Sequence, residues 1–232
     1  MRLKLFSAVM AVCVLLVGLC ACDVGVVDKK YEPTADNYFT FVKIEGGNSY
    51  EISAKEGVEL PATVRLPINH DGRLVSKVAK DGFKNRDEVK SVVIPYSYTE
   101  IGDSAFYGCD KLKKVYVDSK DQADESGAKT SLTIDGFAFA YCGKLVDLDL
   151  RGCVDKIGAY AFKETGITEF KSENVSSIGD CAFEGCKGLL RVTLSEKLGN
   201  VGKTPFNKCK KVLNITNKSG VSTDSLREGL VD

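Results

Sequence analysis

Several residue types on which enzyme and metal sites depend are scarce in this 232-residue chain. It has a single histidine, His70, and no tryptophan. One histidine makes histidine-dependent triads and zinc sites hard to build, and His70 lies in a polar turn where a solvated role is the simpler interpretation. The G-x-S-x-G and H-E-x-x-H motifs and a phosphate-binding glycine loop are also missing. We therefore expect no enzymatic activity, no metal and no cofactor.

The chain has no excess of charge of either sign. Lysine and arginine together number 32, and aspartate and glutamate also number 32. A chain without net positive charge has no general electrostatic attraction to nucleic acid or to an anionic membrane surface. We expect no nucleic-acid partner. The hydrophobic content of 44% is typical of a chain that folds around a core.

One long apolar run is present, at the N-terminus. Arg2 and Lys4 precede an apolar stretch over 5–19, which is short for a membrane span. The stretch ends in Leu19-Cys20-Ala21-Cys22, which resembles the lipobox of bacterial lipoproteins. The resemblance implies a signal peptide over 1–21, cleavage after Ala21 and acylation of Cys22. The mature protein would then be lipid-anchored in a bacterial cell envelope, outside the cytoplasmic membrane. The alternative is an ordinary signal peptide with a chance pair of cysteines.

Two segments separate this leader from the rest of the chain. Residues 22–37 are polar and contain Pro33, which is typical of a flexible tether. Residues 38–77 begin with two alternating apolar and polar runs joined by Glu45-Gly46-Gly47-Asn48, which predicts a β-hairpin. A solenoid needs such a capping element at its first coil, so we expect an N-terminal β cap over 38–77.

The remainder repeats one pattern, I-G-x-x-A-F-x-x-C-x-x-L-x-x-V-x-V, six times between residues 78 and 217. The copies begin at Val78, Ile101, Ile134, Ile157, Ile178 and Val201. A period of about 23 residues with an L-x-x-L-x-L-like tail is typical of a leucine-rich-repeat solenoid. The expected fold class is therefore an α/β repeat. Each coil would contribute one short parallel strand and one short helical turn.

The columns of the aligned repeats indicate what each position does. One column holds phenylalanine in every copy, so we expect the six rings to stack into a spine: Phe83, Phe106, Phe139, Phe162, Phe183 and Phe206. The residue before each ring is small or constrained, which would let the helical turn approach the strands. Two coils are irregular. An insertion occupies 118–133, and the coil from Ile157 is shortened around Thr165-Gly166-Ile167. Residues 218–232 form a C-terminal tail.

The repeat is similar to that of the BspA-like bacterial leucine-rich-repeat proteins, and the match extends over about 62–216. The resemblance implies a surface-exposed protein that binds host matrix or plasma proteins and promotes adhesion. Its ligand would be a protein, and its membrane contact would be the lipid anchor. The alternative is a self-associating scaffold of the cell envelope, a homo-oligomer joined through the last coil around Val212 to Thr216.

Strand geometry sends alternate side chains of each repeat tail to the outer face of the sheet. We expect the ligand to bind these residues: Lys114, Tyr116, Asp147, Asp149, Arg151, Glu169, Lys171 and Arg191. The opposing interpretation for Asp147 and Asp149 is that they are solvated strand residues that form lateral ion pairs with Lys114, Lys171 or Arg151. The outermost position of the second coil, Asp118, would also point away from the core.

Four of the cysteines share one column of the repeat: Cys109, Cys142, Cys186 and Cys209. Neighbouring strands stack about 4.8 Å apart, so adjacent members could reach disulfide distance in an oxidising envelope. The stronger interpretation is that cysteine serves here as a small buried apolar side chain. A zinc site is not expected, because the chain contains no C-x-x-C pair.

Overall fold

The computed structural model describes residues 32–118, 131–150, 152–212 and 214–230. The expected leader over 1–21, the acylated Cys22, most of the tether, Arg151 and most of the insertion lie outside these residues. Residues from Pro33 onward form one compact unit. Within that unit Thr34, at the end of the expected tether, is joined to the cap, because its main-chain N–H donates to the Arg65 carbonyl at 3.0 Å.

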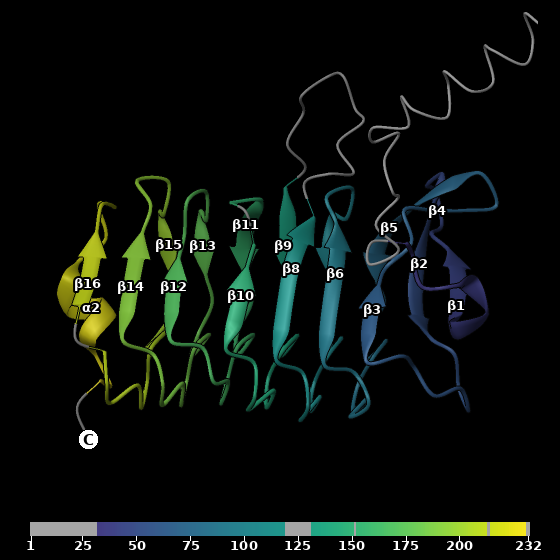
Figure 1. Ribbon diagram of the computed structural model, residues 1–232. Helices are drawn as coiled ribbons and strands as arrows, with labels where there is room; N and C mark the ends of the chain where they lie inside the picture. Colours follow the sequence, from purple (N-terminus) through teal and green to yellow (C-terminus); the bar gives the residue numbers. More distant parts are fainter. Residues whose placement is uncertain (1–31, 119–130, 151, 213, 231–232) are drawn as a thin grey trace, which may run out of the picture. The chain divides into compact units, whose positions relative to one another are not determined.

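The coils stack side by side and form two rows of strands (Figure 1). One row is a nine-stranded sheet in the order β1-β2-β5-β7-β9-β11-β13-β15, with β4 paired to β5. Its strands are β1 (Phe39–Lys43), β2 (Ser49–Ala54), β4 (Asn69–His70), β5 (Arg73–Val78), β7 (Glu100–Ile101), β9 (Leu132–Ile134), β11 (Val154–Ile157), β13 (Ser177–Ile178) and β15 (Asn200–Val201). The first column of the repeat holds this row in register, as in the pairing of Ile101 with Ile134.

The second row contains the repeat tails and is divided into two sheets. Four strands pair in the order β10-β8-β6-β3, and three pair in the order β12-β14-β16. The strands are β3 (Thr63–Arg65), β6 (Ser91–Pro95), β8 (Lys114–Asp118), β10 (Asp147–Asp149), β12 (Glu169–Lys171), β14 (Arg191–Leu194) and β16 (Asn214–Asn217). The expected parallel strand in each coil is confirmed. The structure adds a second short strand per coil and an interruption between β10 and β12.

The expected helical turn in each coil is wrong. The segment around each phenylalanine is a series of tight turns, and two residues per coil have left-handed backbone angles, such as Ser104 (φ 56°) and Gly108 (φ 68°). An α-helix needs right-handed angles throughout and N–H bonds to the carbonyl four residues earlier. Here the N–H of Phe106 instead donates to the Ala138 carbonyl of the next coil at 2.7 Å. Hydrogen bonding between coils therefore replaces the helix.

The predicted phenylalanine spine is confirmed. All six rings are fully buried. Successive centroids lie 5.0, 5.2, 5.4, 5.3 and 5.3 Å apart, with interplanar angles of 23° or less. The glycine at the second position of the repeat allows close stacking of the coils. A Cβ on Gly102, for example, would lie 2.7 Å from the Val78 carbonyl oxygen. The core is therefore one continuous column through the coils.

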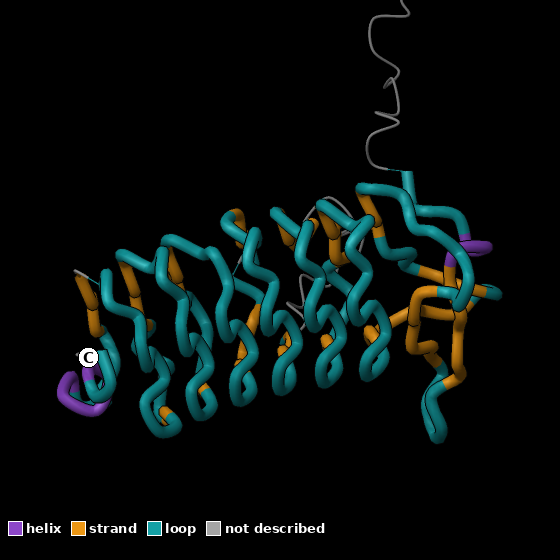
Figure 2. The backbone as a smooth tube through the Cα atoms, turned by 90° about the horizontal axis from the view of Figure 1, so that it is seen from below, coloured by secondary structure: helices purple, strands orange, loops and turns teal. Residues whose placement is uncertain are grey.

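Different elements cover the two ends of the solenoid, as the backbone trace shows (Figure 2). At the N-terminal end, the short 3-10 helix η2 (Asp36–Tyr38) leads into β1 and β2, which pair antiparallel. There the His70 ring stacks on Phe41 at 3.6 Å between centroids, and its Nδ1 lies 2.7 Å from Asp36 Oδ2. At the C-terminal end, helix α2 (Thr223–Arg227) buries Leu226 completely. Across the described ranges, no helix is long and apolar enough to cross a membrane.

Candidate functional site

The outer face of the second row brings together seven of the eight residues expected to bind a ligand. Lys114 and Tyr116 lie on β8, Asp147 and Asp149 on β10, Glu169 and Lys171 on β12, and Arg191 on β14. The eighth, Arg151, lies outside the described residues. The alternation of each strand places these side chains on one side, because the residues between them turn inward.

The part of this face on β8 and β10 is held by one ion pair. The strand register sets Lys114 opposite Asp147, and Lys114 Nζ lies 2.8 Å from Asp147 Oδ2. The hydrogen bond to Asp147 and the charge of that carboxylate raise the pKa of Lys114. The same ammonium lies 5.5 Å from the centre of the Tyr116 ring. A tyrosine fixed between charged neighbours is a suitable anchor for a protein partner.

The part on β12 and β14 is organised around Glu169. Its carboxylate lies 3.1 Å from Arg191 Nη2 and 3.4 Å from Lys171 Nζ. The hydrogen bond from Arg191, followed by the bond from Lys171, lowers the pKa of Glu169. These groups are largely exposed, so such pairs contribute little to stability. They do hold long side chains in place, which lowers the entropy lost when a partner binds.

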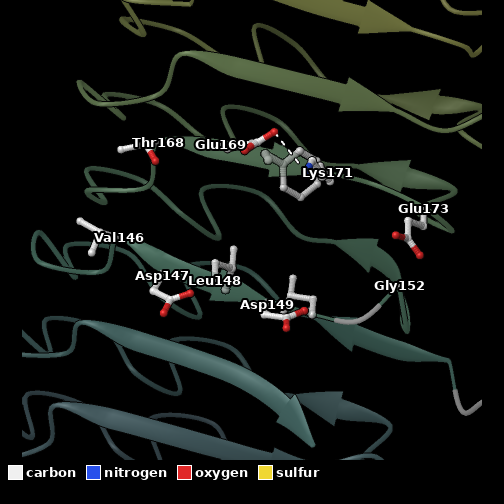
Figure 3. A pocket seen from close by; sticks show the side chains of 11 residues that line it. Val146, Asp147, Leu148, Asp149, Gly152, Thr168, Glu169, Lys171 and Glu173 are labelled. Atoms are coloured by element: carbon white, nitrogen blue, oxygen red, sulfur yellow. Dashed lines mark ion pairs between the residues drawn. The ribbon is translucent and has the colours of Figure 1, made fainter. Parts of the chain in front are cut away.

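The interruption of the strand row separates these two clusters. A cleft of about 350 Å³ lies between β10 and β12, and its walls include Asp147, Asp149, Glu169, Lys171 and Glu173 (Figure 3). The repeat pattern did not predict this cleft. The signals were present in the shortened coil around Thr165-Gly166-Ile167 and in Phe170, which stands where most other strands have valine, leucine or isoleucine. The Phe170 ring packs 4.6 Å from Phe183 of the following coil.

A second surface, along the turns, was also missed. Tyr107 contacts Tyr141 with ring centres 5.2 Å apart, and Phe137 stacks on Tyr160 at 4.9 Å. Lys163 Nζ lies over both Tyr141 and Tyr160, at 5.8 and 5.1 Å. Phe137, Tyr141 and Tyr160 have left-handed angles, which cost a bulky residue energy. The signal was a large aromatic residue at positions where the other coils have non-aromatic residues, such as Asn85, Ser104 and Gly108.

The expectation that Asp118 is open to a partner is wrong. The alternation of β8 keeps it on the same side as Tyr116, but its carboxylate lies 2.6 Å from Arg65 Nη1, and both side chains are 7% exposed. The pair joins the end of β8 to β3, two strands away. Asp118 is therefore a buried member of this side of the sheet and is not accessible to a ligand.

The four cysteines of the repeat column are free thiols in the structure. Each Sγ donates to a phenylalanine carbonyl of the preceding coil, with distances of 3.0–3.1 Å, as in Cys109 to Phe83 and Cys209 to Phe183. The hydrogen bond with Cys109 and burial raise the pKa of the Cys142 thiol well above its usual value. In this geometry, the cysteine column supplies hydrogen bonds between coils, in keeping with the interpretation of these residues as small buried side chains.

Among the described residues, no group of three or more histidine, cysteine, aspartate or glutamate side chains could hold a metal ion. The cleft carries four carboxylates and the ammonium group of Lys171, which lies 3.4 Å from the carboxylate of Glu169. This arrangement can recognise a charged and extended partner.

The repeats match a known family over most of their length. The description of that family is "BspA type Leucine rich repeat region", and it matches in six copies over residues 76–131 and 132–225. The chain belongs to the BspA-type leucine-rich-repeat family. The fold of this family is a solenoid that serves as a generic scaffold for protein interaction. A search of curated proteins gives no significant match.

Solved structures of bacterial leucine-rich-repeat proteins show the same fold. The Treponema pallidum leucine-rich-repeat protein superposes with a TM-score of 0.55 at 24% identity, covering 85% of this chain and 96% of that protein. A Bacteroides ovatus protein gives 0.55 at 20% identity, with coverages of 83% and 58%. A Faecalibacterium prausnitzii leucine-rich cell surface protein gives 0.58 at 24%, with coverages of 82% and 55%. This chain therefore spans little more than half of the last two.

Proposed function

We propose that this BspA-type chain is a surface-anchored binding module that recognises an extracellular protein through the outer face of β8, β10, β12 and β14. The observation that carries the proposal is the cleft between β10 and β12, flanked by Tyr116 and the paired charges around Glu169. Solenoids offer broad and rigid surfaces of this kind. A host matrix or plasma protein is the partner class that an adhesin role requires.

Retention of matrix and plasma proteins by the immobilised chain tests the binding face. We expect the double variant Tyr116→Ala/Asp149→Ala to lower retention at least tenfold, because a central tyrosine anchor contributes about 2 kcal/mol or more. The matched control is Tyr107→Ala/Asp110→Ala, which removes the same side chains from the turn surface. If only this control variant loses retention, the binding site lies on the turns and not on the strand face.

The proposed anchor is an acyl group on Cys22. It is supported by the lipobox resemblance and by the similarity to the F. prausnitzii structure, which is described as a cell surface protein. Two acyl chains attach a protein stably to a membrane, whereas a single chain binds only weakly and reversibly. Expression with a radioactive fatty acid should label the wild-type chain. The Cys22→Ala variant should carry no label, and a variant that stays labelled would contradict lipidation at this residue.

The alternative function is a self-associating scaffold of the envelope. It is favoured by β16, which ends the three-stranded sheet and has an outer edge with no strand partner among the described residues. Such an edge can pair with another chain. Light scattering over a concentration series distinguishes the two functions, since a strict monomer excludes the scaffold.

A further inference from the structure

One hydrogen-bonding edge of β10 lies along the cleft. Asp147 donates its N–H to the Lys113 carbonyl at 3.1 Å, which directs the main-chain groups of Asp147 and Asp149 toward β8. Successive residues of a strand alternate in direction. The N–H and carbonyl of Leu148 therefore face the cleft. No strand pairs with this edge of β10 in the described part of the chain.

The facing edge of β12 is open in the same way. Arg191 donates its N–H to the Thr168 carbonyl at 3.4 Å, which directs Thr168 and Phe170 toward β14. The main-chain groups of Glu169 and Lys171 consequently face the cleft. Two parallel strand edges thus lie opposite each other across a cleft of about 350 Å³. On either side of the cleft, neighbouring strands are hydrogen-bonded to one another, from β3 to β10 and from β12 to β16.

The apolar layer beneath the cleft is also incomplete. Inward residues of neighbouring strands are almost fully buried, as Val115 at 0% and Val192 at 1% exposure show. Leu148 and Leu150, which occupy the same positions on β10 and just after it, are only partly buried. An added strand with apolar inward side chains would cover them and so continue the core of the solenoid.

The rim of the cleft is acidic. Four carboxylates line it, those of Asp147, Asp149, Glu169 and Glu173, against the single ammonium group of Lys171. The difference is three negative charges among the lining residues. Lys114 and Arg191, which pair with Asp147 and Glu169 from the neighbouring strands, offset two of them. Basic side chains on the outer face of an occupant would therefore complement the rim.

From these edges, the partly buried leucines and the acidic rim, we propose that the cleft binds an extended segment of the partner protein as an added strand. The segment alternates apolar side chains, directed inward, with lysine or arginine directed outward. An extended backbone suits the cleft because it offers donors and acceptors to both edges at once. This inference rests on the proposed function and specifies the part of the partner that is recognised.

A nine-residue peptide of alternating lysine and valine is the probe, measured by fluorescence anisotropy with the purified full chain. We expect it to bind, and we expect the same peptide with alternate residues N-methylated to bind at least tenfold more weakly, because methylation removes donors to one edge. A peptide with the same composition in two blocks, lysines then valines, should also bind at least tenfold more weakly. Equal affinity of all three, or no binding by any, would overturn strand addition.

Protein variants test the same geometry from the other side. Leu148→Pro removes the N–H that faces the cleft and leaves the bonds from β10 to β8 in place, as proline at an open edge does. Leu148→Ala is its matched control for the lost side chain. We expect the proline variant to bind the peptide at least fivefold more weakly than the alanine variant. Equal binding by the two, with both folded by circular dichroism, would contradict the proposal.

Charge reversal completes the design. Asp149→Lys/Glu173→Lys should weaken peptide binding at least tenfold, whereas Asp110→Lys, on an exposed turn of an earlier coil, should leave it within twofold. Equal effects at both places would refute recognition by the acidic rim. If the strand face retains whole proteins while no peptide binds, the proposed function stands and strand addition alone fails.

Discussion

Replacing Phe139 by alanine should lower the free energy of unfolding by roughly 3–5 kcal/mol. The ring is fully buried, and its centre lies 5.2 Å from that of Phe106 and 5.4 Å from that of Phe162. Each neighbouring ring is fixed by the hydrogen bonds of its own coil to the next, so neither can move in to fill the space. The cavity therefore stays open. Urea denaturation followed by circular dichroism measures the loss.

The matched control lies in the same coil. Phe137→Ala removes an identical side chain two residues away, where the ring is partly exposed and stacks on Tyr160. We expect this change to cost less than about 1.5 kcal/mol, since little buried area is lost. Equal losses for the two variants would contradict a spine that stabilises the solenoid from within.

Replacing Asp118 by alanine should cost a similar amount, roughly 3–5 kcal/mol. The change leaves Arg65, a residue that is only 6% exposed, without the carboxylate that lies 2.6 Å from its Nη1. Removing one member of a buried ion pair takes away the attraction that offsets the desolvation of the other charge. The midpoint and slope of chemical denaturation give the size of the effect.

A double replacement separates the missing charge from the missing contact. Arg65→Met/Asp118→Leu removes both charged groups at once and fills the site with apolar side chains. We expect it to recover at least half of the stability lost in Asp118→Ala, because no unpaired charge remains. A double variant less stable than the single one would show that the pair itself supplies the stability.

The interior of the solenoid could be predicted from the sequence because its requirements repeat in every coil. Phe83 and its five counterparts occupy one position, and the structure stacks them. The inward residues of the tails, such as Val92 and Val115, are buried as expected. Repetition makes such a pattern visible, since each coil must satisfy the same contacts with its neighbours.

The turns could not be predicted in the same way. The pattern around Ala105 and Phe106 is compatible with a helical turn, which the left-handed angles and the bonds to the next coil exclude. These bonds depend on main-chain atoms, which the residue types do not reveal. Large residues at left-handed positions, such as Tyr141 and Tyr160, obscure the pattern further, because asparagine or glycine is expected there.

The sequence predicted which residues lie on the outer face of the sheet, but it did not predict the cleft between them. The alternation of the tails placed Lys114, Asp147 and Glu169 on one side, and the structure forms the lateral ion pairs among them. The cleft depends on the separation between β10 and β12. That separation follows from the packing of whole coils, which no single residue specifies.

The interrupted strand row is the feature on which the proposed function and strand addition both depend. Amide hydrogen exchange, resolved to single residues, tests it most directly. The amides of Leu148, Glu169 and Lys171 should exchange faster than those of Val115 and Val192 by on the order of 100-fold, because only the latter are paired within a sheet. Uniform protection from β3 to β16 would show a continuous sheet and would contradict an open cleft.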